Sequence, residues 1–188
     1  MKTALITLVI VVLVVLVFGG QLVGARNQLV TERNDIDGRW AQVDNDMKRR
    51  ADLIPNLVET VKGYAKQEQT VIGEVANARA ALLGAHTKQD EINANTQLSG
   101  AIGRLLVLQE NYPELKSNEN FLRLQDELAG TENRIAVDRR DYNESIKKYN
   151  TDIDLFPKNV AASMFGFHRD DAYFKATEEE KKVPQVKF

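Results

Sequence analysis

Residues 3–25 read TALITLVIVVLVVLVFGGQLVGA and contain no charged side chain. As an α-helix with a rise of about 1.5 Å per residue, this run would extend roughly 34 Å. The hydrocarbon core of a bilayer is about 30 Å thick, so the run is long enough to cross it. A helix that is apolar on all sides has no face to turn toward water. The chain is therefore expected either to be anchored in a membrane or to be exported across one.

Two interpretations of this run compete. A cleaved signal peptide also needs a basic start, an apolar centre and small residues at the cut, and Val23-Gly24-Ala25 could serve as the cut. The run is long for a signal peptide, however, and the helical pattern continues through the possible cleavage site. We therefore favour a retained single-pass anchor over residues 1–25. No Cys follows the run, which excludes lipoprotein processing.

The charges that flank the run give a weak indication of its orientation. Lys2 precedes it, whereas Arg26, Arg33 and Arg39 follow within the distance that influences insertion. This small excess favours an orientation with the main domain on the cytoplasmic side of the membrane. The same run contains Gly20 and Gly24, four residues apart, a spacing that lets two membrane helices approach closely. These glycines predict self-association, or they simply mark the end of the apolar segment.

The remaining residues have the composition of one helical domain. They are rich in Ala, Leu, Glu, Gln, Lys and Arg, and the whole chain has only four prolines. The net charge of −2 is spread over mixed acids and bases, without a basic stripe, so nucleic-acid binding is not expected. The absence of Cys excludes disulfides, thiolate catalysis and cysteine-based zinc sites. We predict an all-α protein: a single N-terminal transmembrane helix followed by an antiparallel bundle of long helices.

A stripe of apolar residues at alternating spacings of three and four follows the anchor, with Arg50 and Glu68 at stripe positions. Its apolar members are Ile36, Trp40, Val43, Met47, Ile54, Leu57, Val61, Tyr64, Val71, Val75, Ala78 and Leu82. Pro55 lacks the N–H that a helix needs, yet the stripe keeps its phase across it. The pattern fits one long kinked helix, or two helices joined by a tight turn at residues 51–54. The sequence leaves both open.

Two further helices are expected downstream. One runs from about Asp90 to Glu110 and ends at Asn111-Tyr112-Pro113. The next is capped by Ser117 or Asn118 and reaches Phe156, before Pro157. A short helix at 160–167 is expected to follow. The predicted organisation is an anchor at 1–25, a helical bundle at 26–156, a short terminal helical segment at 157–174 and a mobile tail at 175–188.

The pattern of specific residues resembles the bacterial LemA family over nearly the whole chain. Residues 48–65 read KRRADLIPNLVETVKGYA, and residues 131–135 read TENRI. Further matching residues are Asn27-Gln28-Leu29-Val30, Arg33, Trp40, Val43, Leu128, Arg139, Tyr142-Asn143, Tyr149-Asn150, Phe156-Pro157, Phe165-Gly166-Phe167 and Tyr173-Phe174. The resemblance implies a single N-terminal anchor and a four-helix bundle of bromodomain-like topology. It implies no established activity, although relatives occur in magnetosome formation.

Residues that could perform catalysis are sparse. The only histidines, His86 and His168, have no metal-binding partner at helical spacing, and the chain has no glycine-rich phosphate loop. We therefore expect no enzyme activity, no cofactor and no metal site. Tyr142, Tyr149 and Phe156 recur every seven residues and are interpreted as core residues.

One group of polar residues lies close to the predicted core. Its members are Arg50, Asp52, Glu132, Asn133, Arg134 and Arg139. Arg50 and Asp52 are expected to meet the other four across the bundle, as a structural network or a partner-binding surface. Arg134 and Asp138 could also pair along their helix.

Two functional hypotheses follow. The first is a membrane-anchored, non-enzymatic scaffold or interaction module that forms homo-oligomers and binds an unidentified membrane-associated protein. The alternative is a membrane-associated enzyme or regulator whose site uses Arg50, Glu132, Asn133, Arg134 and Arg139.

Overall fold

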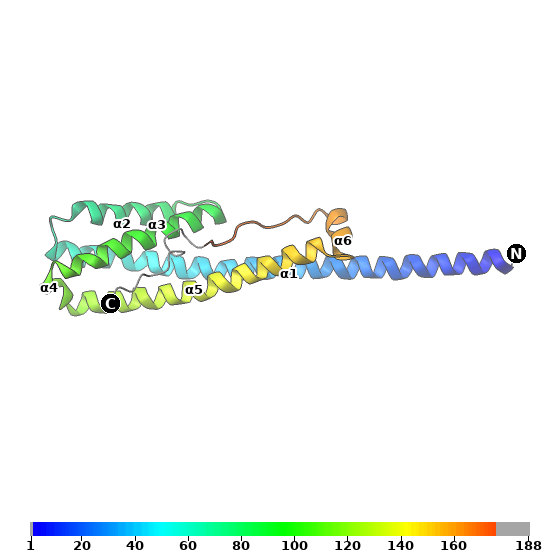
Figure 1. Cartoon of the computed structure of the whole chain (residues 1–188), viewed down its shortest axis with the longest axis horizontal. Helices are drawn as coiled ribbons and strands as arrows, with labels where there is room; N and C mark the ends of the chain where they lie inside the picture. Colours follow the sequence, from blue (N-terminus) through cyan, green and yellow to red (C-terminus); the bar gives the residue numbers. More distant parts are fainter. Residues whose placement is uncertain (1, 176–188) are drawn as a thin grey trace, which may run out of the picture. The chain divides into compact units, whose positions relative to one another are not determined.

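The computed structural model describes residues 2–175, and these are almost entirely helical (Figure 1). The elements are α1 (Lys2–Tyr64), α2 (Gln69–Leu83), α3 (Lys88–Val107), the 3-10 helix η1 (Leu108–Glu110), α4 (Pro113–Lys116), α5 (Glu119–Asp154) and α6 (Lys158–Phe165). No strand occurs among the described residues. The predicted all-α class with a long apolar N-terminal helix is confirmed. The tail at 175–188 was predicted to be mobile, and its residues 176–188 lie outside the described part of the chain.

Helix α1 passes through Pro55 without a turn, so the single-helix alternative is correct and the turn at 51–54 does not form. In an uninterrupted helix, the N–H of residue 55 would donate to the carbonyl of Ala51, which is fully buried. Proline cannot make this bond. Instead, Nε of Arg79, on α2, donates a hydrogen bond to the Ala51 carbonyl oxygen at 2.8 Å. A side chain from a second helix therefore satisfies the carbonyl that Pro55 leaves without its helical partner.

The continuous stripe predicted from Ile36 to Leu82 is interrupted, which corrects that part of the sequence analysis. Helix α1 ends at Tyr64, and α2 begins at Gln69 after a turn in which the Glu68 N–H donates to the Ala65 carbonyl at 3.1 Å. Side chains secure this turn: the Tyr112 hydroxyl lies 3.1 Å from a Glu68 oxygen, and Asn118 donates to the Tyr64 hydroxyl at 2.9 Å. The apolar residues on both sides keep the same phase, so their periodicity did not reveal the turn.

The other helix ends lie near the predicted ones. The helix expected from about Asp90 to Glu110 is α3, Lys88–Val107, and Thr87, which was not predicted as a cap, accepts from the Asp90 N–H at 3.1 Å. Of the two proposed caps for α5, Asn118 accepts from the Phe121 N–H at 2.9 Å. Helix α4, which begins at Pro113, was not predicted, and α5 ends at Asp154 rather than Phe156. Helix α6 begins and ends two residues before the predicted 160–167.

The described residues divide into two compact units. The first contains 2–40 and 141–171, and the second contains 41–140 and 172–175. In the second unit, residues of α1, α2, α3 and α5 form the core, and α2 packs along α3. Its fully buried apolar side chains include Val43, Leu57, Val61, Val75, Leu98, Leu105, Phe121 and Ile135.

The first unit pairs the N-terminal part of α1 with the C-terminal part of α5. Gln28 donates to Asp152 at 3.3 Å, Lys148 lies 3.4 Å from Glu32, and Trp40 packs on Tyr142 with ring centroids 5.1 Å apart. As the residue number rises along α1, the residue number of its contact on α5 falls, so the two segments are antiparallel in this unit.

Three aromatic residues were expected in the core. Tyr142 and Tyr149 are buried as predicted, but Phe156 is 73% exposed. The expectation for Phe156 is wrong because the helix stops at Asp154, and the seven-residue rhythm has no meaning beyond its end. The chain after α6 instead folds against α5: Tyr149 donates to the His168 carbonyl at 3.0 Å, and Asn150 to the Asp170 carbonyl at 2.7 Å.

Candidate functional site

The candidate site is centred on a buried arginine. Arg50 occupies the same face of α1 as Met47 and Ile54, three residues before and four residues after it, and only 2% of its surface is exposed. A charged group in such a position must be hydrogen-bonded and paired, because burial without partners would cost several kcal/mol.

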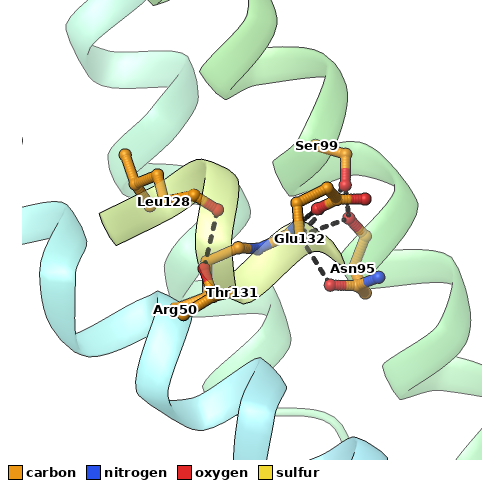
Figure 2. A network of polar contacts seen from close by, with 6 residues as sticks. All are labelled: Arg50, Asn95, Ser99, Leu128, Thr131 and Glu132. Atoms are coloured by element: carbon orange, nitrogen blue, oxygen red, sulfur yellow. Dashed lines mark hydrogen bonds and ion pairs between the residues drawn. The ribbon is translucent and has the colours of Figure 1, made fainter. Parts of the chain in front are cut away.

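Partners from two other helices surround the Arg50 guanidinium (Figure 2). One terminal nitrogen donates to a Glu132 carboxylate oxygen on α5. The other lies 2.6 Å from the Asn95 side-chain oxygen, 3.3 Å from the Asn95 carbonyl and 3.0 Å from the Ser99 hydroxyl, all on α3. The neighbouring Thr131 hydroxyl donates to the Leu128 carbonyl at 2.8 Å, within α5. The cluster of Arg50, Glu132, Asn95 and Ser99 therefore joins three helices of the second unit.

The electrostatics of this cluster are asymmetric. Burial lowers the pKa of Arg50, and this effect outweighs the opposing influence of the Glu132 charge. The guanidinium nevertheless remains charged at neutral pH, because arginine is not deprotonated in proteins. Glu132 is 45% exposed and keeps contact with water. The pair is thus a buried cation neutralised by a half-exposed carboxylate.

The other predicted site residues are distributed around this cluster and do not all join it. Arg134 pairs with Asp46 of α1 at 3.5 Å, an ion pair between two helices. Arg139 lies near enough to Arg50 to lower its pKa further, and its guanidinium stacks on Phe174 at 4.9 Å from the ring centroid.

Two further candidates, Asp52 and Asn133, are exposed at the surface of the second unit. Their participation in the polar zone around Arg50 stays a prediction.

Sequence reasoning missed Asn95 and Ser99. Asn95 is 1% exposed and lies three residues after Ile92 and three before Leu98, both of which are buried. That spacing places it on the inward face of α3 and could have identified it as a core polar residue. It needed a partner of the kind that Arg50 provides.

An open cleft of about 390 Å³ adjoins the cluster. Arg50, Ser99 and Glu132 line it together with apolar or uncharged residues, namely Ile102, Gly103, Leu106, Gln125, Leu128 and Ala129. The cleft is large enough for a small molecule. Both terminal nitrogens of Arg50, however, already donate hydrogen bonds to side chains of the protein. Among residues 2–175, no group of three or more His, Asp or Glu side chains could hold a metal ion. His86 and His168, the two histidines, are both exposed.

A second polar cluster, which the sequence analysis did not identify, lies in the first unit. Glu32 is 5% exposed; it accepts from Gln28 at 3.0 Å, and Lys148 is nearby. Burial raises the pKa of Glu32, and the adjacent Asp152 carboxyl raises it further. Burial also opposes ionisation of Asp152, but hydrogen bonds from Glu32 and from Lys158, which lies 2.5 Å away, leave the Asp152 pKa lowered.

Comparison with known proteins agrees with the residue blocks at 48–65 and 131–135. A sequence model of the LemA family matches residues 39–188. The chain belongs to the LemA family. It is 27% identical to Magnetosome protein MamQ 2 of Paramagnetospirillum magneticum over 194 aligned residues, covering 89% of this chain and 71% of the relative. It is also 25% identical to Protein LemA of Metamycoplasma hominis over 160 residues, covering 85% of this chain and 73% of that protein.

The Arg50 cluster lies inside the matched region and the apolar run lies before it. Helix α1 is the one helix in residues 2–175 that is long and apolar enough to span a membrane, and none of its most apolar stretch is buried. This LemA-family chain therefore combines a candidate membrane helix with a helical domain in one uninterrupted α1.

Proposed function

We propose that this LemA-family chain is a membrane-anchored, non-enzymatic scaffold or interaction module. The observation that carries the proposal is the continuity of α1, which runs as one helix from the exposed apolar stretch at its start to the buried Arg50 and beyond. The apolar run and part of the helical domain therefore belong to the same helix, so a domain attached in this way would be held at the membrane. The names of the magnetosome relatives describe a cellular structure rather than a reaction, which agrees with this role.

The proposal includes the finer architecture expected from the sequence. The anchor would occupy residues 1–25 and the antiparallel four-helix bundle residues 26–156, with a short terminal segment at 157–174. The contacts that Arg50 makes with both α3 and α5, and the bond from Arg79 to α1, support a bundle in which four helical segments share one core. The membrane would be the bacterial cytoplasmic membrane, with the bundle on the cytoplasmic side.

The chemistry of the Arg50 cluster supports a structural role over a catalytic one. Catalysis needs a nucleophile or an acid–base pair directed at a space that substrate can enter. The terminal nitrogens of Arg50 instead bond to Glu132, Asn95 and Ser99, which fixes the register of three helices. This is the use of buried ion pairs that is best attested.

Self-association would proceed through the anchor. Added side-chain carbons at Gly20 and Gly24 would meet nothing within 4 Å, so this face of α1 is open to a second copy. Close approach of two helices at small residues is a common mode of association in membranes.

The test is crosslinking of the full chain in its native membrane, followed by mass measurement in mild detergent. The wild type is expected to form homo-oligomers and to retain a membrane-associated partner. The Gly20→Ile, Gly24→Ile double variant is expected to lose the homo-oligomer while its circular dichroism stays unchanged. A wild-type chain that is monomeric and captures no partner would overturn the scaffold proposal.

The cleft beside Arg50 and Glu132 favours one second candidate, a regulator that binds a small molecule there. Its test is a thermal-shift screen of metabolites on the full chain in detergent, with Leu106→Trp as a variant that fills the cleft. A ligand that raises the melting temperature of the wild type but not of Leu106→Trp would favour the regulator.

A further inference from the structure

An apolar patch remains uncovered around α6. It consists of Leu155, Phe156, Met164 and Phe165, which are 55%, 73%, 64% and 45% exposed. Leu155 and Phe156 directly follow α5, whereas Met164 and Phe165 end α6, so both ends of the α5–α6 corner present large apolar side chains. We call these four residues the α6 patch. Exposed apolar clusters of this kind mark surfaces that bind a partner or a membrane.

The position of the patch along α1 follows from the contacts within the first unit. Gln28 meets Asp152 on an antiparallel α5, so the end of α5 at Asp154, directly before Leu155 and Phe156, lies level with about Arg26. At the other end of the patch, the Arg26 guanidinium lies 5.6 Å from the centroid of the Phe165 ring. Figure 1 accordingly draws α6, in orange, beside the blue part of α1. Both ends of the patch therefore lie at the level where the charge-free run of α1 finishes.

That level corresponds to the edge of a bilayer. A hydrocarbon core of about 30 Å accommodates about 20 helical residues. If the core begins near Thr3, it ends close to Val23. Gly24 and Arg26 then lie in the headgroup region, where aromatic side chains are enriched and where amphipathic segments sink about 5–10 Å.

Charge does not explain the patch. Lys158 pairs with Asp152 at 2.5 Å, and Arg169 pairs with Asp154. These two cations beside α6 are thus neutralised within the chain, and Arg26, whose guanidinium lies over the Phe165 ring, adds a single charge to an otherwise apolar surface. What the corner offers is apolar area, which a membrane takes up regardless of lipid charge.

We propose that the α6 patch inserts into the interface of the same bilayer that α1 crosses. The corner then acts as a second, shallow contact that fixes the tilt and rotation of the anchor relative to the membrane plane. This inference rests on the proposed membrane anchor, because the depth of the patch is set by α1.

The test uses single-cysteine variants of the full chain, which has no cysteine of its own. Phe156→Cys and Met164→Cys report on the patch and Val12→Cys reports on the anchor. Leu122→Cys is the matched control, since Leu122 is an equally apolar residue, 44% exposed, in the second unit. Each variant carries a polarity-sensitive fluorophore and is reconstituted in phosphatidylcholine vesicles containing lipids with a nitroxide close to the headgroup.

The nitroxide lipids are expected to quench the labels at 156 and 164 at least about twofold more than the label at 122. Replacing part of the phosphatidylcholine with anionic lipid is expected to leave these values unchanged. Quenching at 12 without quenching at 156 and 164 would overturn the inference and leave the anchor intact, whereas no quenching at 12 would refute the anchor itself. Fluorescence at 156 that changes on dilution with unlabelled protein, but not with nitroxide lipid, would assign the patch to a second copy and also overturn the inference.

Discussion

The bond between Arg79 and the Ala51 carbonyl makes a sharp prediction about how α1 tolerates Pro55. Replacing Arg79 with Met keeps the apolar stem but leaves a buried carbonyl without a donor, at the 2.8 Å contact that the structure shows. A hydrogen bond to a charged group contributes about 1.5–3 kcal/mol, so we expect Arg79→Met to cost about 2 kcal/mol of unfolding free energy. The partial exposure of Arg79 keeps the value from the upper end of this range.

A double-mutant cycle separates this effect from ordinary packing. In the Pro55→Ala background, the new N–H at position 55 can donate to Ala51, so Arg79→Met should cost about 1 kcal/mol less than in the wild type. Urea denaturation of the detergent-solubilised chain, followed by circular dichroism at a helical wavelength, gives the four free energies. The control is Arg104→Met, which removes an exposed ion pair with Glu74 and should cost less than about 1 kcal/mol. Equal costs of Arg79→Met in both backgrounds would refute the argument that Arg79 replaces the missing N–H.

Three further predictions concern the two polar clusters and the aromatic contact. Glu132→Ala leaves the buried Arg50 cation without its counter-charge and is expected to lower the free energy of unfolding by about 3 kcal/mol, whereas Arg50→Met removes the charge itself and should lower it less. The reverse order of the two free energies in urea denaturation would contradict the proposed network. The raised pKa of Glu32 means that ionisation of this carboxyl opposes folding, so the stability of the Glu32→Gln variant relative to the wild type should increase as the pH rises above 4.5. A stability difference that does not change with pH would argue against burial of the charge. Trp40→Ala should cost about 2–3 kcal/mol, because the ring is only half-buried but packs on Tyr142, and a loss below about 1 kcal/mol would show that this contact contributes little.

The sequence predicted the helices well because long apolar stripes and caps are local signals. Asn118, one of the two predicted caps of α5, accepts from the Phe121 N–H, and the stripe keeps its phase across Pro55, where the structure has one continuous helix. The turn after Tyr64 was not predictable from the same signal, because the stripe resumes in α2 without a change of phase. Periodicity reports which face is buried and says nothing about where the chain reverses.

The candidate site was predictable only in part. Arg50 and Glu132 were identified because a charged side chain in an apolar stripe needs an oppositely charged or hydrogen-bonding partner. In the structure Arg50 donates a hydrogen bond to Glu132. Asn95 was missed because asparagine on a helix usually faces water. Glu32 was missed although the same spacing argument applies, since it lies three residues after buried Leu29 and four before buried Ile36. Which side chain meets a buried polar group depends on contacts between helices, and no local pattern encodes them.

The central claim is that the apolar start of α1 remains attached and holds the helical domain at the membrane. Intact-mass analysis of the protein recovered from a carbonate-washed membrane fraction of its host tests this directly. The account predicts that the protein stays with the membrane and that its mass includes residues 3–25, in keeping with a chain of 21.2 kDa. Recovery in the wash, with a mass that lacks these residues, would contradict it.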